Sequence, residues 1–321
     1  MKNKKIRVAV LFGGKSAEHE VSIQSAKNVI ASLDNKKYEV IKIKIGKEGN
    51  WDFDTKNADV VFPVLHGPFG EDGTVQGLLR FANIRFVGSG VLGSAIGMDK
   101  DVAKRLMRDA GLPVAKFLVF RKGENVEYEH IEKILGVPFF LKPANLGSSV
   151  GVSKVKRKKD FLPALKEAFQ YDTKIIIEEY IEGREIECSV LGNDDPIASV
   201  PGEIIAKHEF YDYDAKYIDE NGADLKVPAD LAADVVEQVQ LLAIKVFKIL
   251  CLEGMARVDF FLAPSGKIFI NETNTIPGFT NISMYPKLWK ASGISYQELV
   301  DRLIELAIEK HNEQQKLKTS K

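Results

Sequence analysis

The sequence predicts an α/β protein built from two or three domains. Its 321 residues are too many for one small core. Short apolar runs that read as buried strands alternate with stretches of helical periodicity, and glycine-rich turns separate several of them. The composition, with 45% hydrophobic and 28% charged residues, is that of an ordinary globular chain.

Charge, hydropathy and cysteine content argue against several classes of protein. Lys plus Arg and Asp plus Glu number 45 each, so net charge gives no reason to expect nucleic acid or an anionic membrane as partner. No apolar run approaches bilayer length, and the basic first residues lead into a strand-like run rather than a signal peptide. Cys188 and Cys251 lack a metal-binding or redox neighbourhood. We therefore expect a cytoplasmic protein with reduced thiols.

The first α/β unit opens with a buried strand at residues 6–12, a glycine turn at residues 13–16 and a helix at residues 22–33. The turn lacks the full G-x-G-x-x-G spacing, so a nicotinamide site is not expected. Glu18 follows at the carboxyl end of the strand, which is the edge where α/β folds bind small ligands. It could accept hydrogen bonds from a substrate ammonium; capping the helix is the alternative.

A second buried strand is predicted at residues 60–65, and His66 comes directly after it. Residues 67–74 contain three glycines and a proline, which allow close backbone approach to a ligand. If the two strands pair in parallel, His66 lies beside Glu18; the alternative is a structural histidine. Residues 87–93 close this unit.

A second unit is expected to begin near residue 98, with helices and strands at residues 98–107, 114–120, 129–135 and 139–143. Lys142 lies near the end of the last of these strands, and a loop rich in glycine and serine follows at residues 144–152. The backbone N–H groups of such a loop could cover phosphates as a flexible flap. It is not a Walker A loop, because its lysine precedes the glycines; a plain surface loop is the alternative.

The last part of the chain contains further regular elements, predicted at residues 175–181, 186–191, 231–250 and 296–308. The polar residues after Ile308 are expected to fray. Residues 207–227 have no apolar period but hold Tyr211, Tyr213, Lys216 and Tyr217 close together, so an ordered lid is favoured over a disordered segment.

The most informative stretch is a predicted β-hairpin at residues 257–274, with a turn at residues 263–267. Because side chains alternate along a strand, Arg257 and Asp259 share one face of the first strand, and Glu272 and Asn274 share one face of the second. Folding can bring these faces together. Two carboxylates and an amide oxygen suit Mg²⁺, and a fixed arginine can stabilise a transferring phosphoryl group. A solvated edge hairpin is the alternative.

Taken together and in order, these motifs resemble the D-alanine–D-alanine ligases, which have the ATP-grasp fold. The resemblance extends over nearly the whole chain. The segments that match lie, in order, at residues 12–22, 66–73, 98–100, 142–143, 147–151, 210–217, 257–259 and 271–278. The resemblance implies a Rossmann-like N-terminal domain that precedes two ATP-grasp subdomains. The implied parts are residues 1–98, residues 99–182, residues 183–310 with a lid at 207–227, and a polar tail at 311–321.

The resemblance also implies an activity. The enzyme would join two D-alanines with ATP, through a D-alanyl phosphate, and release ADP and phosphate for peptidoglycan precursor synthesis. ATP would lie between the last two parts together with two Mg²⁺ ions, for which Mn²⁺ can substitute. A cytoplasmic homodimer is the expected form.

The family's substrate-binding roles carry over residue by residue. Glu18 would hold the ammonium of the first D-alanine, in a hydrogen-bonded group with Ser148 and Tyr217, and His66 would help place that substrate. Two residues would contact the second substrate. Ser283 would bind the carboxylate of that substrate, and Met284 would lie beside it.

The roles toward ATP and the reacting groups also come from the resemblance. The residues that would hold the nucleotide are Lys100, Lys142, Ser149, Glu178, Tyr180, Ile181, Glu185 and Lys216. The magnesium ligands would be Asp259, Glu272 and Asn274. Arg257 would stabilise both transition states, and the N–H of Gly278 would serve as oxyanion donor.

Two rival interpretations remain open at this point. A ligase of the same fold could use D-lactate or D-serine as acceptor, although Tyr217 argues against D-lactate because the depsipeptide-forming relatives place a different residue there. A nucleotide-binding protein that has lost catalysis is the other, and the intact residues of the hairpin argue against it.

Overall fold

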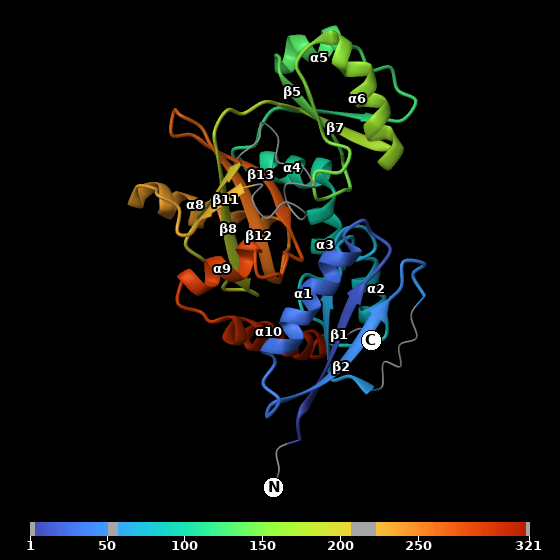
Figure 1. The fold of residues 1–321 in the computed structure, drawn as a ribbon, viewed down its shortest axis with the longest axis vertical. Coiled ribbons are helices and arrows are strands. Elements are labelled where there is room, and N and C mark those ends of the chain that lie inside the picture. The colour runs from blue at the N-terminus through green and yellow to red at the C-terminus, as the bar shows by residue number, and fades with distance from the viewer. Residues whose placement is uncertain (1–3, 51–56, 207–222, 319–321) are drawn as a thin grey trace.

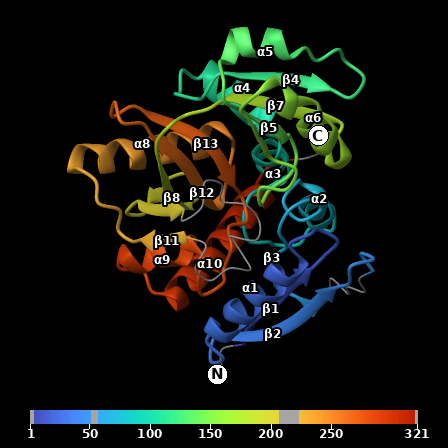
Figure 2. The same ribbon diagram turned by 45° about the horizontal axis from the view of Figure 1, so that its top comes forward.

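The computed structural model describes residues 4–50, 57–206 and 223–318, and its sheets and helices confirm the α/β class. Figures 1 and 2 show three units around a common centre: the blue N-terminal unit, the green central unit and the olive-to-red C-terminal unit. Within the described ranges, no helix is both long enough and apolar enough to cross a membrane.

The N-terminal unit contains a parallel sheet in the order β2-β1-β3. Its strands and helices are β1 (Ile6–Gly13), α1 (His19–Ser32), β2 (Tyr38–Ile45), β3 (Val60–Val64), α2 (Thr74–Phe81) and α3 (Val91–Met98). Because β1 and β3 pair directly and in parallel, the residues that follow both strands meet at one edge of the sheet. The pairing assumed for Glu18 and His66 is therefore confirmed.

The central unit is an antiparallel sheet in the order β4-β7-β5-β6. Its elements are α4 (Lys100–Asp109), β4 (Phe117–Arg121), α5 (Tyr128–Leu135), β5 (Phe139–Pro143), β6 (Ser153–Val155), α6 (Lys158–Tyr171) and β7 (Lys174–Glu179). The strand predicted at residues 114–120 begins only at Phe117, because Val114 forms a separate bridge to Ile270 in the C-terminal sheet.

The C-terminal unit is a sheet in the order β11-β10-β8-β12-β13, with β9 paired to β8. Its elements are β8 (Arg184–Gly192), β9 (Ile197–Ala198), β10 (Gly202–Ala206), β11 (Ala223–Lys226), α8 (Ala233–Ile249), β12 (Gly254–Leu262), β13 (Ile268–Asn274), α9 (Met284–Ala291) and α10 (Tyr296–Gln315). The predicted hairpin is confirmed as β12 and β13, and α8 packs its apolar side on this sheet.

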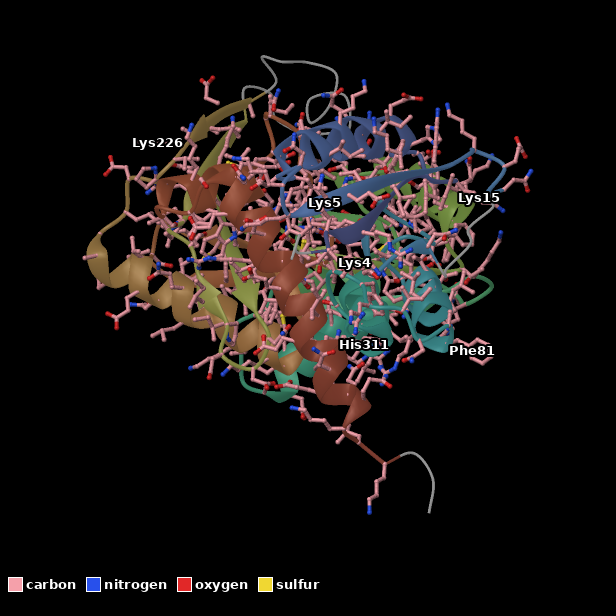
Figure 3. All side chains as sticks on the ribbon, turned by 90° about the horizontal axis from the view of Figure 1, so that it is seen from below. Lys4, Lys5, Lys15, Phe81, Lys226 and His311 are labelled. Carbon is pink, nitrogen blue, oxygen red and sulfur yellow. The ribbon has the colours of Figure 1, made fainter. Side chains whose placement is uncertain are left out.

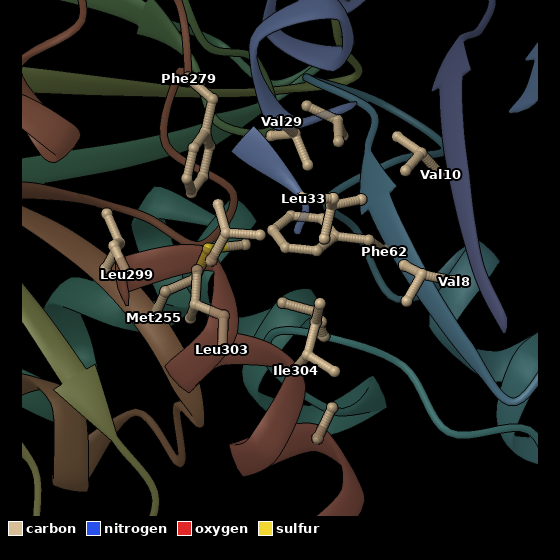
Figure 4. Packing of buried hydrophobic residues seen from close by; sticks show 14 of the residues in the cluster. Val8, Val10, Val29, Leu33, Phe62, Met255, Phe279, Leu299, Leu303 and Ile304 are labelled. Atoms are coloured by element: carbon tan, nitrogen blue, oxygen red, sulfur yellow. The ribbon is translucent and has the colours of Figure 1, made fainter. Parts of the chain in front are cut away.

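One apolar core joins the two ends of the chain. Side chains of β1 and β3, among them Val8 and Phe62, pack against Leu303 and Ile304 of α10, as Figure 4 shows. Phe279, which follows the hairpin, meets Phe62 edge-on with ring centroids 5.9 Å apart. This shared core holds the edge of the N-terminal sheet against the segment after β13.

Two predictions about irregular stretches were wrong in part. The chain does not fray between Ile308 and Gln315, because α10 continues to Gln315 and its Lys310 is buried beside Glu253. The stretch expected to be a lid at residues 207–227 ends in a strand, β11, which pairs with β10. The rest of that stretch, residues 207–222, lies outside the described residues.

Candidate active site

A cavity of about 370 Å³ lies where the three units meet. Its wall includes nine of the side chains or backbone groups predicted for the site: Glu18, His66, Ser148, Arg257, Glu272, Asn274, Gly278, Ser283 and Met284. These residues come from the N-terminal unit, the glycine-serine loop, the hairpin and the segment after it. We call this space the substrate cavity.

A second cavity of about 280 Å³ lies between the central and C-terminal sheets. Its wall contains most of the residues predicted to hold the nucleotide: Lys100, Lys142, Ser149, Glu178, Tyr180, Ile181 and Glu185. We call this space the nucleotide cavity. Gly147 and Glu272 line both cavities, so the nucleotide cavity lies beside the substrate cavity at the hairpin. A group held at this border would be accessible from both cavities.

The hairpin carries a compact polar cluster at this border. Asp259 stands opposite Glu272, and Arg257 stands opposite Asn274. The guanidinium of Arg257 donates to both oxygens of Asp259, at 2.7 and 2.8 Å, and the amide of Asn274 donates to Asp259 Oδ2 at 3.0 Å. The polar faces predicted from strand alternation therefore do converge.

Sequence reasoning missed Glu187, which completes this cluster. It lies on β8 directly opposite Asp259, and its Oε2 is 3.0 Å from Arg257 Nε. Glu187 shares a strand face with Glu185, so the alternation of polar residues within a buried strand was the available signal. Glu187 and Asp259 together fix the guanidinium in place.

The donor set of the hairpin fits magnesium. Asp259 and Glu272 supply hard carboxylate oxygens and Asn274 an amide, which suits an ion that takes one or two carboxylates and fills its shell with water and phosphate oxygens. In the described part of the chain, no three His, Cys, Asp or Glu side chains form a complete cage.

Glu18 and the glycine-serine loop meet in the substrate cavity. Ser148 Oγ donates to Glu18 Oε1 at 2.5 Å, and the Glu18 carboxylate makes no capping bond to α1, which was its alternative role. Gly67 passes so close that a Cβ there would lie 2.9 Å from Glu18 Oε2, and its φ is +75°. A side chain at position 67 would therefore displace Glu18.

His66 lines the cavity, but its ring is held by protein on both sides. Nδ1 lies 3.0 Å from the carbonyl oxygen of Ile276, and Nε2 lies 3.2 Å from Ser25 Oγ. A carbonyl can only accept, so Nδ1 carries the proton and Nε2 accepts from the serine. Burial lowers the pKa of His66, against the opposing charge of Glu18. The neutral ring thus ties β3 to the segment that leads to Gly278.

Three lysines converge on the nucleotide cavity. Glu178 is buried between Lys142, 2.7 Å from its Oε2, and Lys104, 2.8 Å from its Oε1. Lys100 lies 3.6 Å from Glu272 at the border of the cavities. Sequence reasoning missed Lys104, although it lies four residues after Lys100 and so on the same helix face.

The electrostatics of this lysine group are strongly perturbed. Burial alone would raise the pKa of Glu178, but the charges of Lys104 and Lys142 outweigh it and bring the pKa to about 2. Burial lowers the pKa of Lys104, and Glu178 opposes that shift. Lys154 and Tyr180 also line the nucleotide cavity, and the Lys154 ammonium stands 4.1 Å from the centre of the Tyr180 ring. This wall offers fixed positive charge and an aromatic surface, as a nucleoside phosphate requires.

Glu71 is a further buried carboxyl group that sequence reasoning missed. Its Oε1 accepts from Gly67 N at 2.8 Å, and its Oε2 accepts from Ile276 N at 3.2 Å. It therefore links the loop after β3 to the segment after β13. Burial, reinforced by repulsion from Glu18, raises the pKa of Glu71 to about 8, although the accepted hydrogen bonds oppose the shift.

We expect the Glu71→Gln change to alter the pH dependence of stability. A carboxyl group whose pKa is near 8 in the folded chain and about 4.5 when unfolded takes up a proton on folding, so its contribution to stability falls as pH rises through this window. Glutamine cannot titrate. The free energy of unfolding of the variant, relative to the unmodified protein, should therefore rise by ~1.4 kcal/mol per pH unit.

Urea unfolding at several pH values between 5 and 8 measures this difference. Glu313→Gln, at an exposed position of α10, is the control and should give a flat difference. A flat difference for Glu71→Gln as well would contradict the assignment.

Two predicted residues, Lys216 and Tyr217, lie in the stretch 207–222 and so outside the described residues. The expected contact of Tyr217 with Glu18 and Ser148 therefore stays a prediction.

The fold and the two joined cavities define the class of protein. An antiparallel sheet and a larger sheet that enclose a lysine-lined cavity, beside a carboxylate-bearing hairpin, are the features of an ATP-grasp enzyme.

Comparisons with known proteins give the family. Residues 7–58 and 52–89 match the model of the D-ala D-ala ligase N-terminus, and residues 106–305 match that of the C-terminus. The D-alanine--D-alanine ligase of Oceanobacillus iheyensis is 51% identical, over 99% of both chains, and D-alanine--D-alanine ligase A of Escherichia coli is 47% identical, over 98% of this chain and 99% of its own. The chain belongs to the D-alanine–D-alanine ligase family.

Solved structures agree with this assignment. The ligase from Coxiella burnetii superposes with a TM-score of 0.89 at 41% identity, over 97% of this chain and 96% of its own. The VanG D-Ala:D-Ser ligase of Enterococcus faecalis gives 0.86 at 38% identity, over 95% and 100%. The Bacillus anthracis ligase, solved with ATP, gives 0.83 at 31% identity, over 96% and 99%. The fold is therefore shared by ligases with different acceptors.

Proposed function

We propose that this enzyme joins two D-alanine molecules to D-alanyl-D-alanine at the expense of ATP, as a step in peptidoglycan precursor synthesis. The observation that carries the proposal is the border between the two cavities, where Glu272 lines both. Family membership supplies the reaction class. The proposal treats residues 1–98, 99–182 and 183–310 as the functional domains. Of the stretch 311–321 that the sequence predicted to be a polar tail, residues 311–315 complete α10.

In the first step, a carboxylate oxygen of one D-alanine forms a bond to the γ-phosphorus of ATP, and the bond to the bridging oxygen breaks to release ADP. Glu18 holds the substrate ammonium, supported by Ser148 and Tyr217. The phosphates are neutralised by Lys100, Lys142 and Lys216. Reactions of this kind depend mainly on positioning and charge neutralisation, which these residues provide.

Two Mg²⁺ ions bound to Asp259, Glu272 and Asn274 would neutralise phosphate charge when present, and Mn²⁺ can take their place. The carboxylates are supported as ligands by their register across the hairpin. Arg257 is held by Glu187 and Asp259, so it is fixed before substrate arrives. A fixed guanidinium needs no reorganisation to stabilise the transferring phosphoryl group.

In the second step, the amine of the second D-alanine bonds to the carbonyl carbon of the acyl phosphate, and phosphate leaves. The backbone N–H of Gly278 donates to the oxygen that becomes negative. Ser283 and Met284 hold the second substrate, and the proposal is supported by their place in the wall of the substrate cavity. Adenosine is held by Tyr180, Ile181, Glu185 and the carboxyl end of β7.

The identity of the acceptor is tested by a product assay with D-alanine, D-lactate and D-serine as competing acceptors at neutral pH. We expect D-alanyl-D-alanine as the main product. Tyr217→Phe should lower the rate and the selectivity for an amine; unchanged rate and selectivity would refute that role. Predominant depsipeptide or D-serine product would overturn the acceptor assignment. Absence of D-alanine-dependent phosphate release would favour a nucleotide-binding protein without catalysis.

We propose in addition that two copies associate through α2 and α3. Phe81 is 93% exposed, and Leu78 and Leu92 on the same two helices are also exposed, which makes an apolar face without a described partner in one chain. Phe81→Glu is expected to convert a dimer into a monomer in light scattering after gel filtration. Leu162→Glu, at an exposed position of α6, is the matched control and should stay dimeric. A monomeric unmodified protein, or a dimeric Phe81→Glu variant, would contradict this interface.

We place the reaction in the cytoplasm, where ATP is available. Membrane and soluble fractions of cells that express the enzyme can be compared for D-alanine-dependent phosphate release. Activity confined to the membrane fraction would contradict this location.

A further inference from the structure

A third cavity lies away from the active site, between α10 and the loop that follows α2. Its volume is about 170 Å³, and its wall carries Arg80, Arg85, Lys310 and His311, with the amides of Asn83 and Gln315. We call it the basic cavity. It shares no lining residue with the substrate cavity or the nucleotide cavity. Figure 3 shows His311 on α10 at the face of the molecule seen from below.

The positive charge of the basic cavity is only partly neutralised within the described ranges. Lys310 pairs with Glu253, which is not part of the wall and also accepts from Gly90 N at 3.0 Å. No described carboxylate lines the cavity. Arg80 and Arg85 take part in no ion pair with the described residues. Two guanidinium groups therefore keep their charge available.

Arg85 also has an unused donor. Its Nη1 reaches the backbone oxygen of Asp59 at a distance of 3.5 Å, which is long for a hydrogen bond. Its Nε is buried and has no hydrogen-bond partner in the described part of the chain. Leaving a buried charged donor unpaired is costly, and such groups are normally satisfied by protein, water or a bound ion. The described protein therefore satisfies the Arg85 guanidinium only in part.

The positive charge of the two arginines contributes to the pKa shifts of Lys310 and His311. Burial, reinforced by Arg85, lowers the pKa of His311. Burial also lowers the pKa of Lys310; Glu253 opposes this shift and Arg80 adds to it. An anion in the cavity would raise the pKa of both groups and so oppose the lowering caused by the two arginines.

We propose that the basic cavity binds a small dianion of the phosphate class. Arginine forks match the oxygens of phosphate. Gln315 Nε2 donates to Asn83 Oδ1 at 2.7 Å, so of these two amides it is Asn83 Nδ2 that offers a further donor. The cavity has less than half the volume of the substrate cavity, which favours phosphate or a small phosphomonoester over a nucleotide. The site is independent of the proposed ligase activity.

The test uses the nuclear magnetic resonance of the His311 ring in the full-length enzyme, assigned with the His311→Gln variant. Inorganic phosphate and glycerol phosphate are titrated at constant ionic strength. We expect a saturable shift of the His311 signal, with a dissociation constant in the millimolar range or below. Tighter binding of glycerol phosphate would identify a phosphomonoester as the ligand, whereas equal binding would identify the phosphate group alone. Both outcomes support the site.

Arg85→Gln should weaken the binding at least about tenfold, because it removes the charge of one of the two guanidinium groups in the wall of the cavity. Arg121→Gln, an exposed arginine on β4, is the matched control and should bind as the unmodified protein does. Ligase activity should be unchanged in Arg85→Gln, which shows that the variant folds. A linear shift that sodium chloride reproduces, or equal binding by folded Arg85→Gln, would overturn the proposal.

Discussion

Replacing Glu272 by glutamine is expected to abolish ligation while the protein remains folded. Glu272 lines both cavities and lies 3.6 Å from Lys100, so its charge is placed where the phosphoryl group must pass. Glutamine keeps the size of the side chain but removes the anionic oxygens that we propose as a magnesium ligand. A metal ion contributes several kcal/mol to such transition states, and each 1.36 kcal/mol is tenfold in rate, so kcat should fall at least ~10²-fold.

Coupled-enzyme measurement of ADP release at saturating ATP and D-alanine, over a series of Mg²⁺ concentrations, gives the effect. The midpoint for Mg²⁺ should move to higher concentration, because one ligand has lost its charge. Glu237→Gln on the exposed side of α8 is the control and should retain full activity. A folded Glu272→Gln enzyme with near-normal rate would remove this residue from the metal site.

The part of the site that could be predicted is the part that depends on local periodicity. Two alternating runs around a proline-glycine turn predict a hairpin, and alternation alone places Arg257 with Asp259 and Glu272 with Asn274. The register of β12 and β13 confirms both. In the same way, two buried strands that are followed by Glu18 and by His66 predict one shared edge once parallel pairing is assumed.

The missed residues depend on the order of strands in the sheets, which no single stretch encodes. Glu187 joins the cluster because β8 lies between β10 and β12 in antiparallel register. Glu71 reaches Ile276 across 205 positions of sequence. In the part of α10 beyond Ile308, the buried Lys310 pairs with Glu253, which is also remote in the sequence. In each case the partner is remote, so local polarity predicts a solvated side chain where the fold supplies a contact.

A related difference concerns Glu178, for which the resemblance implies a role toward adenosine. In the structure its two oxygens face Lys104 and Lys142, and the residue is 3% exposed. Its negative charge holds two lysines at the wall of the nucleotide cavity. This arrangement predicts a large effect on stability as well as on catalysis.

Glu178→Gln is expected to lower the free energy of unfolding by ~3–5 kcal/mol at pH 7, because it leaves buried ammonium groups without their counter-ion. Lys104 is 2% exposed and its pKa is already lowered by burial. Without the carboxylate, that pKa falls further. A lysine whose pKa is lower in the folded chain than in the unfolded one binds fewer protons when folded, so stability rises with pH. The difference in free energy of unfolding between the variant and the unmodified protein should therefore become smaller as pH increases from 7 toward 10.

Urea unfolding over this pH range measures the deficit, and the affinity for ATP reports the loss of order around Lys142. Glu179→Gln, the next residue on β7, is the matched control. Its ion pair with Lys116 is 3.9 Å long and partly exposed, so its loss should cost less than ~1 kcal/mol. Adding Lys104→Met to Glu178→Gln should recover part of the lost stability, because one unpaired buried charge is removed. If Glu178→Gln and Glu179→Gln were equally stable at pH 7, the prediction that Glu178 stabilises the charged forms of Lys104 and Lys142 would be wrong.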